Sequence, residues 1–82
     1  MFKVYAIESL IKGRIYIGYT SDVIARLNYH NAGYVKSTSK DRPWRLIALE
    51  NFESESEVRW SERSLKRSRG QRLRWIEKYR IE

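Results

Sequence analysis

Three residues at intervals of four give the first sign of chemistry in this sequence: Asp22, Arg26 and His30. On a helix this spacing places them one above another along one face. Arginine donates hydrogen bonds to anionic oxygens, and histidine can accept or donate a proton near neutral pH. The strand pattern before the helix holds Tyr16 and Gly18, which brings both within reach of these side chains. Two interpretations without function also fit: an exposed Arg26 paired with Asp22, and a His30 favoured at a helix C-terminus by the helix dipole.

A second sign of chemistry is a carboxylate on a helix face that should be buried. Glu62 shares a helix face with Val58 and Leu65. Removing a carboxylate from water is costly unless a cation or a metal ion meets it. Lys66 or Arg59 on the same helix would form a structural ion pair, and a functional carboxylate is the other interpretation.

Two strands precede the helix that carries Arg26. Alternating residues over Phe2–Ile7 predict the first strand, and Arg14–Thr20 predicts the second. The turn between them holds Lys12–Gly13, a suitable positive-φ position, so the strands should form an antiparallel hairpin. Tyr5 and Tyr16 then lie on neighbouring strands, and the sequence leaves their register open.

The helix after the second strand begins at a capping pair. Ser21 or Asp22 can accept hydrogen bonds from its free amide groups. Val23, Ile24 and Leu27 are expected to form its buried stripe.

A long irregular stretch, Asn31–Pro43, follows this helix, and Gly33 is the residue at which the helix is expected to end. Its cations and hydroxyls are Lys36, Lys40 and Arg42 with Ser37, Thr38 and Ser39. A flexible loop of this composition suits phosphate contacts. It is equally typical of any solvated loop in a basic protein.

A third strand is predicted over Trp44–Phe52. Its alternation gives two faces: Trp44, Leu46, Ala48 and Glu50 against Arg45, Ile47, Leu49 and Asn51. Because both faces are largely apolar, cover is expected on each side.

Two helices are expected to complete the chain. Ser54 with Glu57 is a capping-box signature for a helix to about Ser68, with Gly70 just past its end. A last helix is expected over Gln71–Arg80, and its inward residues should be Leu73, Ile76 and Tyr79. The elements give an α+β domain of order ββαβαα with a three-stranded antiparallel sheet.

Charge indicates the class of partner. Seventeen Lys and Arg against ten acidic residues give a net charge of +7. Such a surface attracts polyanions, and interleaved aromatic rings favour nucleic acid because rings can stack on bases. An ordinary solvated basic surface and anionic lipid are the alternatives.

Size and residue usage narrow the class further. Eighty-two residues allow one domain, expected to span residues 1–82. The absence of cysteine excludes disulfides and thiolate metal sites, and one histidine cannot build a histidine-rich zinc site. No apolar run reaches the length of a membrane span, and the first ten residues lack a signal-peptide plan. We therefore expect a cytoplasmic protein with no membrane contact.

Several short motifs occur along the chain in a fixed order and spacing, and together they are a specific signal. The set consists of Val4-Tyr5, Tyr16-Ile17-Gly18, Arg26, Leu27-x-x-His30-Asn31-x-Gly33, Arg42-Pro43-Trp44 and Glu62-x-x-x-Lys66. The set resembles the GIY-YIG nuclease superfamily, above all its small single-domain bacterial members, and is similar to the N-terminal nuclease domain of the bacterial excinuclease subunit. The resemblance runs from Val4 to about Gly70. It departs at Lys3-Val4, where the first motif has glycine and isoleucine, and at Tyr19, where the excinuclease domain has lysine.

The resemblance implies metal-dependent hydrolysis of a phosphodiester, with Tyr5, Tyr16, Arg26 and His30 catalytic. Tyr16, with Tyr5 nearby, would accept the proton of an attacking water, and Arg26 would hold a phosphate oxygen. His30 would position phosphate or relay a proton. Glu62 would bind one divalent ion, Mg²⁺ or Mn²⁺, since a single carboxylate suits an ion that keeps several waters.

Five further residues are expected to contact the substrate. Gly18 would let the substrate backbone approach closely. The cations Lys36, Lys40, Arg42 and Lys66 would contact phosphate. The predicted function is a DNA endonuclease, structure-selective or repair-related.

Two other functions remain open. One is a nucleic-acid-binding module of the same fold with little or no catalysis, and the other is action on RNA. A partner protein for targeting is also open, and the sequence leaves the oligomeric state undetermined.

Overall fold

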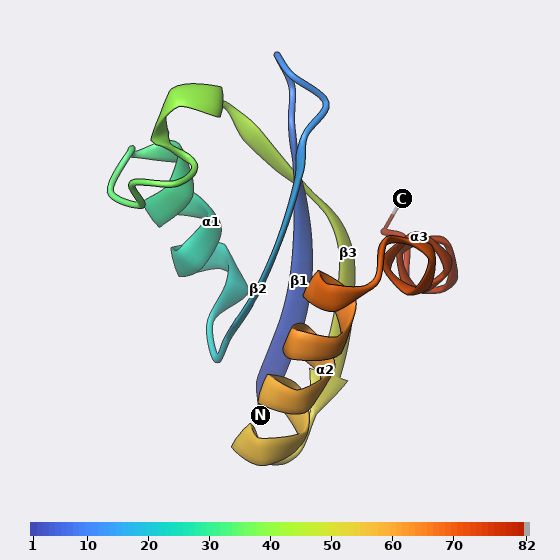
Figure 1. Ribbon diagram of the computed structural model, residues 1–82. Coiled ribbons are helices and arrows are strands. Elements are labelled where there is room, and N and C mark those ends of the chain that lie inside the picture. The colour runs from blue at the N-terminus through green and yellow to red at the C-terminus, as the bar shows by residue number, and fades with distance from the viewer. Residues whose placement is uncertain (82) are drawn as a thin grey trace.

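The computed structural model describes residues 1–81. Its elements are β1 (Phe2–Ser9), β2 (Ile15–Thr20), α1 (Val23–Asn31), the short 3₁₀ helix η1 (Ser39–Asp41), β3 (Trp44–Phe52), α2 (Glu55–Arg67) and α3 (Arg69–Lys78). The predicted α+β order ββαβαα is confirmed (Figure 1). In this part of the chain no helix combines the length and apolar character needed to cross a membrane.

The three strands form one antiparallel sheet in the order β2-β1-β3. The turn between β1 and β2 holds Gly13 at φ 70°, as its predicted positive-φ role requires. Tyr5 pairs with Gly18, and Ile7 pairs with Tyr16. Because paired residues share a face, this register places both tyrosines on the same face of the sheet.

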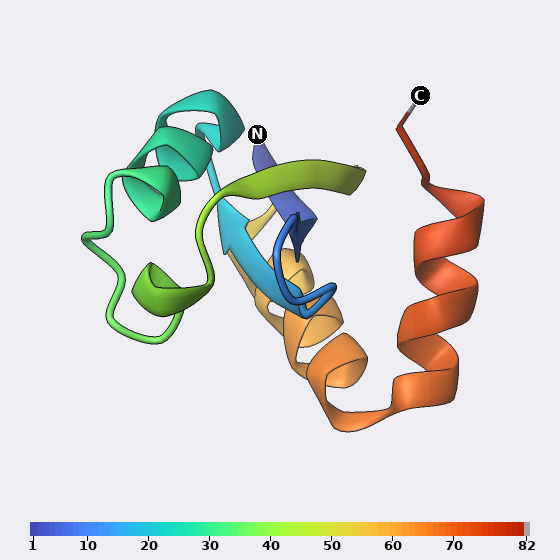
Figure 2. The same cartoon turned by 90° about the horizontal axis from the view of Figure 1, so that it is seen from above.

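Each face of the sheet has its own core. The first face carries Tyr5, Ile7 and Trp44, and α1 packs on it. The second face carries Val4 and Ala6 and is covered by α2 and α3. Figure 2 shows α1 and α3 on opposite sides of the strands. The predicted cover on both sides of β3 is therefore confirmed.

The predicted alternation of β3 is wrong beyond Leu46. The pairing with β1 shifts between Ala6 and Ile7, so that a bulge interrupts β3. Ile47 and Ala48 consequently both pack into the second-face core, whereas the prediction placed Ala48 on the face of Leu46.

The boundary between α2 and α3 also differs from the prediction. Ser54 caps α2 by accepting from the Glu57 amide at 3.2 Å, as expected. Ser68, in extended conformation, ends α2 and also caps α3, where its hydroxyl accepts from the Gln71 amide. Gly70 therefore lies in the first turn of α3 and is not the stop predicted for α2.

Two apolar residues predicted to be buried are exposed. Ile24 on α1 is 68% exposed, and Leu73 on α3 is 47% exposed. On α3 the buried pair is Trp75 and Ile76. Both helices are short, so a small rotation from the expected face moves a flanking residue into solvent.

Candidate active site

A buried chain of hydrogen bonds lies at the centre of the first face. The hydroxyl of Tyr5 on β1 lies 2.9 Å from Nε2 of His30 on α1. Nδ1 of His30 lies 2.9 Å from Oγ1 of Thr38, in the loop that leads to η1. All three side chains are buried. The chain therefore joins a strand, a helix and a loop inside the protein.

The hydrogen bonds of Thr38 assign the direction of this chain. Its hydroxyl donates to the Val35 carbonyl at 3.3 Å, so its oxygen accepts from Nδ1–H of His30. Nε2 is then the acceptor of the imidazole, and the Tyr5 hydroxyl donates to it.

Burial and charge keep both titratable groups of the chain neutral. Burial, together with the positive charge of Arg26, lowers the pKa of His30 to about 4. Burial raises the pKa of Tyr5. The nearby Arg26 guanidinium lowers this pKa in part, whereas the Tyr16 and Glu62 groups raise it further. His30 does lie in the last turn of α1, as the helix-dipole alternative requires, but this alternative does not account for the buried hydrogen bonds of its ring.

Tyr16 on β2 packs beside this chain and is half-buried. Its ring meets the imidazole of His30 edge-on, with centroids 5.0 Å apart. Nζ of Lys66 on α2 lies 5.5 Å from the Tyr16 ring centroid. Tyr16 thus links the buried chain to the residues that α2 brings to the edge of β2.

Gly18 has a structural role that the sequence did not suggest. A Cβ atom at this position would lie 2.4 Å from the hydroxyl oxygen of Tyr5. The phenol of Tyr5 fills the space over the glycine, so a larger residue would displace the ring. The predicted approach of substrate to Gly18 remains a prediction.

Arg26 on α1 does not form the expected pair with Asp22. Asp22 instead caps α1, where its carboxylate accepts from the Ala25 amide at 3.1 Å. Within residues 1–81 no ion pair joins the two side chains. The guanidinium lies 5.5 Å from the ring centroid of Tyr29, and both residues line a hollow of about 180 Å³ that also includes Thr20. The hollow gives a ligand access to Arg26.

The carboxylate of Glu62 on α2 lies 3.2 Å from Nζ of Lys66, and its side chain is 21% exposed. Of the two expected ion pairs, the one with Lys66 is formed. No group of three or more His, Cys, Asp or Glu side chains that could hold a metal ion occurs in residues 1–81. A single half-buried carboxylate nevertheless fits Mg²⁺ or Mn²⁺, whose other ligands can be water and substrate phosphate.

The loop of predicted phosphate-binding cations forms hydrogen bonds within itself and with Arg14. The Arg42 side chain donates to the Ser39 carbonyl at 2.6 Å, and Arg14 donates to the Ser37 carbonyl at 2.8 Å. Lys36 and Lys40 are exposed. Within residues 1–81 no hydrogen bond or ion pair joins Lys36, Lys40 or Arg42 to Tyr5 or Tyr16, so their substrate contacts remain a prediction.

Sequence reasoning missed the supports of the buried chain. Thr38 was expected only as one hydroxyl among several in a polar loop. The Trp44 indole donates to the Thr38 carbonyl at 2.9 Å, and Asn31 bonds both the amide and the carbonyl of Trp44. Neighbouring Ser37 and Ser39 have the same chemistry, so nothing in the sequence singles out Thr38.

Fold and site together define a small α+β domain in which one sheet face carries a phenol–imidazole pair flanked by an arginine and a carboxylate. The model of the GIY-YIG catalytic domain matches residues 1–80, so the chain belongs to the GIY-YIG family. This membership supports a nuclease-like function and implies nucleic-acid binding.

The relatives are proteins of similar size. A UPF0213 protein of Staphylococcus haemolyticus is 45% identical over 65 residues, which cover 77% of this chain and 79% of the relative. A UPF0213 protein of Streptococcus agalactiae serotype V is 38% identical over 72 residues, which cover 85% and 82%. The solution NMR structure of the UPF0213 protein BH0048 from Bacillus halodurans matches with a TM-score of 0.58 and 32% identity, covering 94% of this chain and 84% of that one.

Proposed function

We propose that this protein is a metal-dependent endonuclease that hydrolyses phosphodiester bonds in DNA and that is structure-selective or repair-related. The observation that carries the proposal is the convergence of four elements on one place. Tyr5 from β1, Tyr16 from β2, and His30 from α1 are in contact, and the charges of Arg26 and Glu62 act on the Tyr5 phenol. Elements this far apart in sequence meet there around buried polar groups.

The two tyrosines take different roles in this proposal. Tyr5 is 1% exposed, and burial raises its pKa, so it keeps its proton and holds His30. Tyr16 is half-buried and is therefore the phenol that water can reach. We assign the acceptance of the water proton to Tyr16, and the positioning of the surrounding side chains to Tyr5 and His30.

The cations and the carboxylate handle the phosphate. Arg26 lines a hollow open to ligand, where its planar fork can hold a phosphate oxygen. Glu62 would hold the divalent ion, which when bound supplies stabilisation of negative charge on the phosphate and leaving oxygen. Lys66 lies beside both Glu62 and Tyr16, so its ammonium group would be available to contact phosphate.

The test compares cleavage of supercoiled, branched and nicked DNA in Mg²⁺ or Mn²⁺ by the native chain, Glu62→Ala and Arg26→Ala. Each substitution should lower the rate by about a hundredfold or more, because each removes a charge contact to the transition state. Glu77→Ala and Arg74→Ala are matched controls, since both residues are exposed on α3. Equal cleavage by all five proteins would contradict the site.

One observation favours a second candidate, a nucleic-acid-binding module without useful catalysis. Lys66 already neutralises Glu62 at 3.2 Å, as in a structural ion pair. This candidate predicts DNA or RNA binding with a steep salt dependence and no strand cleavage with either metal. Cleavage that requires Glu62 would exclude it, and cleavage of RNA in preference to DNA would change the substrate.

A further inference from the structure

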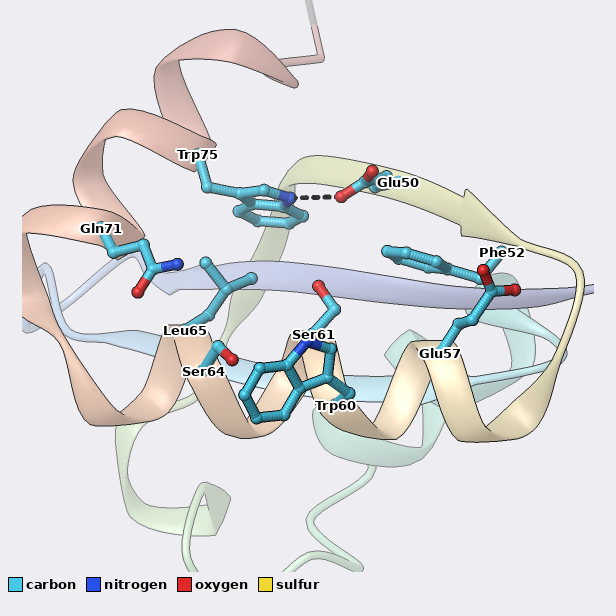
Figure 3. Close-up of a pocket in the computed structure, with 9 residues that line it drawn as sticks. All are labelled: Glu50, Phe52, Glu57, Trp60, Ser61, Ser64, Leu65, Gln71 and Trp75. Atoms are coloured by element: carbon cyan, nitrogen blue, oxygen red, sulfur yellow. Dashed lines mark hydrogen bonds between the residues drawn. The ribbon is translucent and has the colours of Figure 1, made fainter.

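A cavity of about 370 Å³ lies on the second face, between β3, α2 and α3. Figure 3 shows Trp60 of α2 and Trp75 of α3 across from each other, with the hydroxyl of Ser61 between them. Phe52 and Glu57 stand at the other end, and Glu50 lies beside Trp75. No residue of the proposed nuclease site lines this cavity.

The charge of the cavity is opposite to that of the protein. Its nine lining residues include two glutamates and no lysine or arginine, whereas 17 of the 82 residues of the chain are basic. The Trp75 indole donates to the Glu50 carboxylate at 2.8 Å, which holds that carboxylate against the wall. The Glu57 carboxylate accepts from the Ser54 hydroxyl at 2.9 Å. Both acids are thus fixed in a locally negative hollow.

Three aromatic rings complete the lining, from Phe52, Trp60 and Trp75. The Trp60 side chain is exposed although it is large and apolar. Aromatic faces attract cations, and tryptophan attracts them most strongly. Rings and carboxylates together suit an organic cation, and they disfavour phosphate, carboxylate ligands and nucleic acid.

Among organic cations the lining favours a guanidinium group. A guanidinium is planar and weakly hydrated, stacks on indole rings and forms forked hydrogen bonds with carboxylates. No lining residue is a cation that would neutralise the carboxylate of a free amino acid. The group should therefore belong to an arginine within a polypeptide, where that carboxylate is an amide.

We propose that the cavity between β3, α2 and α3 binds an arginine side chain of a partner protein. The site is independent of nuclease activity, because Lys66, which pairs with Glu62, lies beside Tyr16, whereas Trp60 of the same helix lines the cavity. A partner bound there leaves the proposed nuclease site on the first face free. The two surfaces can therefore be occupied at the same time.

The test is an NMR titration of the whole chain with N-acetyl-arginine N-methylamide, read on the tryptophan indole N–H signals. The three tryptophans supply their own control: Trp60 and Trp75 line the cavity, and Trp44 is buried on the first face. The signals of Trp60 and Trp75 should shift and that of Trp44 should not. The citrulline analogue has the same shape without charge, so it should bind about tenfold or more weakly.

Two variants and one control variant sharpen the result. Trp60→Ala should raise the dissociation constant of the arginine probe by about two- to fivefold, and its exposed position spares the fold. Glu57→Gln should weaken binding, while Glu53→Gln, exposed and outside the lining, should not. DNA cleavage should be unchanged in all three variants, which separates this test from that of the nuclease site.

Four outcomes would overturn the proposal. They are equal shifts with the citrulline analogue, equal shifts at Trp44, binding of free L-arginine as tight as that of the capped form, and no shift at all. Sedimentation gives a separate test of the identity of the partner. A dimer that Trp60→Ala dissociates would assign the arginine to a second copy of this chain and not to a different protein.

Discussion

The two faces of the sheet are built in different ways. The first face holds a buried polar chain, Tyr5–His30–Thr38, in which each side chain needs a partner. The second face holds an apolar core around Val4 and Ala6 with two helices packed on it. Burying polar groups brings little net stability, whereas apolar burial is the main favourable contribution to folding. We infer that packing on the second face stabilises the fold, and that the buried polar groups of the site on the first face offset part of this stability.

The difference predicts that stability and activity respond to different residues. Substitutions on the second face should lower the free energy of unfolding and leave the chemistry of folded molecules unchanged. Substitutions on the first face should change both quantities, or activity alone.

The largest stability effect is expected on the second face. Ile76 is buried there, so Ile76→Ala should lower the free energy of unfolding by about 2–5 kcal/mol. Leu73→Ala, three residues away and half-exposed, should cost less than about 1 kcal/mol. Urea unfolding measures both, and Ile76→Val is the milder variant if the first fails to fold. Equal losses at the two positions would contradict the placement of α3.

The next effect tests the first face by pH. The pKa of His30 is about 4 in the folded chain and about 6.5 in the unfolded one. The unfolded state therefore binds more protons between these values, and stability is complete above pH 6.5 and falls as the pH drops towards 4. The loss should approach about 3 kcal/mol, from about 1.4 kcal/mol per pKa unit. His30→Gln should remove this part of the pH dependence of urea unfolding, and an unchanged profile would place the imidazole in water.

Periodicity and capping chemistry explain how much of the fold was predictable. The alternation of the first strand, the turn at Gly13 and the Ser54 cap are local signals, and each was confirmed. The β3 bulge was not predictable, because it depends on the register between two strands. The prediction that α2 ends at Gly70 was also wrong, because Ser68 both ends α2 and caps the start of α3.

The site was predictable to a smaller extent. The motif spacing named Tyr5 and Tyr16, but only the register showed that they share a face. Gly18 was interpreted as room for substrate, and its contact with the Tyr5 ring appears only in three dimensions. The catalytic roles of these residues stay predictions until activity is measured.

A smaller effect is expected where the first face is most crowded. Gly18→Ala would place a methyl group 2.4 Å from the Tyr5 hydroxyl oxygen, so the ring must move away from His30. Overpacking of this kind should cost about 1–3 kcal/mol and lower the cleavage rate. Gly70→Ala is the matched control, because its nearest neighbour is the flexible end of Arg74 at 3.5 Å. It should be neutral or slightly stabilising. Thermal melts and DNA cleavage check both, and a harmless Gly18→Ala would mean that the ring adapts.

The smallest effect concerns the direction of the buried chain. Thr38→Val keeps the shape of the side chain and removes the oxygen that accepts from Nδ1–H of His30. The free energy of unfolding should fall by about 1–3 kcal/mol, and the loss should be near the lower end if the imidazole finds another hydrogen-bond partner. Without this acceptor the imidazole is free to exchange tautomers, and in the other form Nε2–H would donate to the Tyr5 oxygen and reverse that bond.

Nitrogen-15 NMR of the single histidine distinguishes the two forms. The native chain should show Nδ1–H, Thr38→Val should show a mixture, and Thr38→Ser, which retains the hydroxyl, should remain as the native chain. A native Nε2–H form would reverse the assigned donor and acceptor. The Tyr5 hydroxyl would then be free to donate towards the phosphate, and the division of roles between Tyr5 and Tyr16 would have to be redrawn.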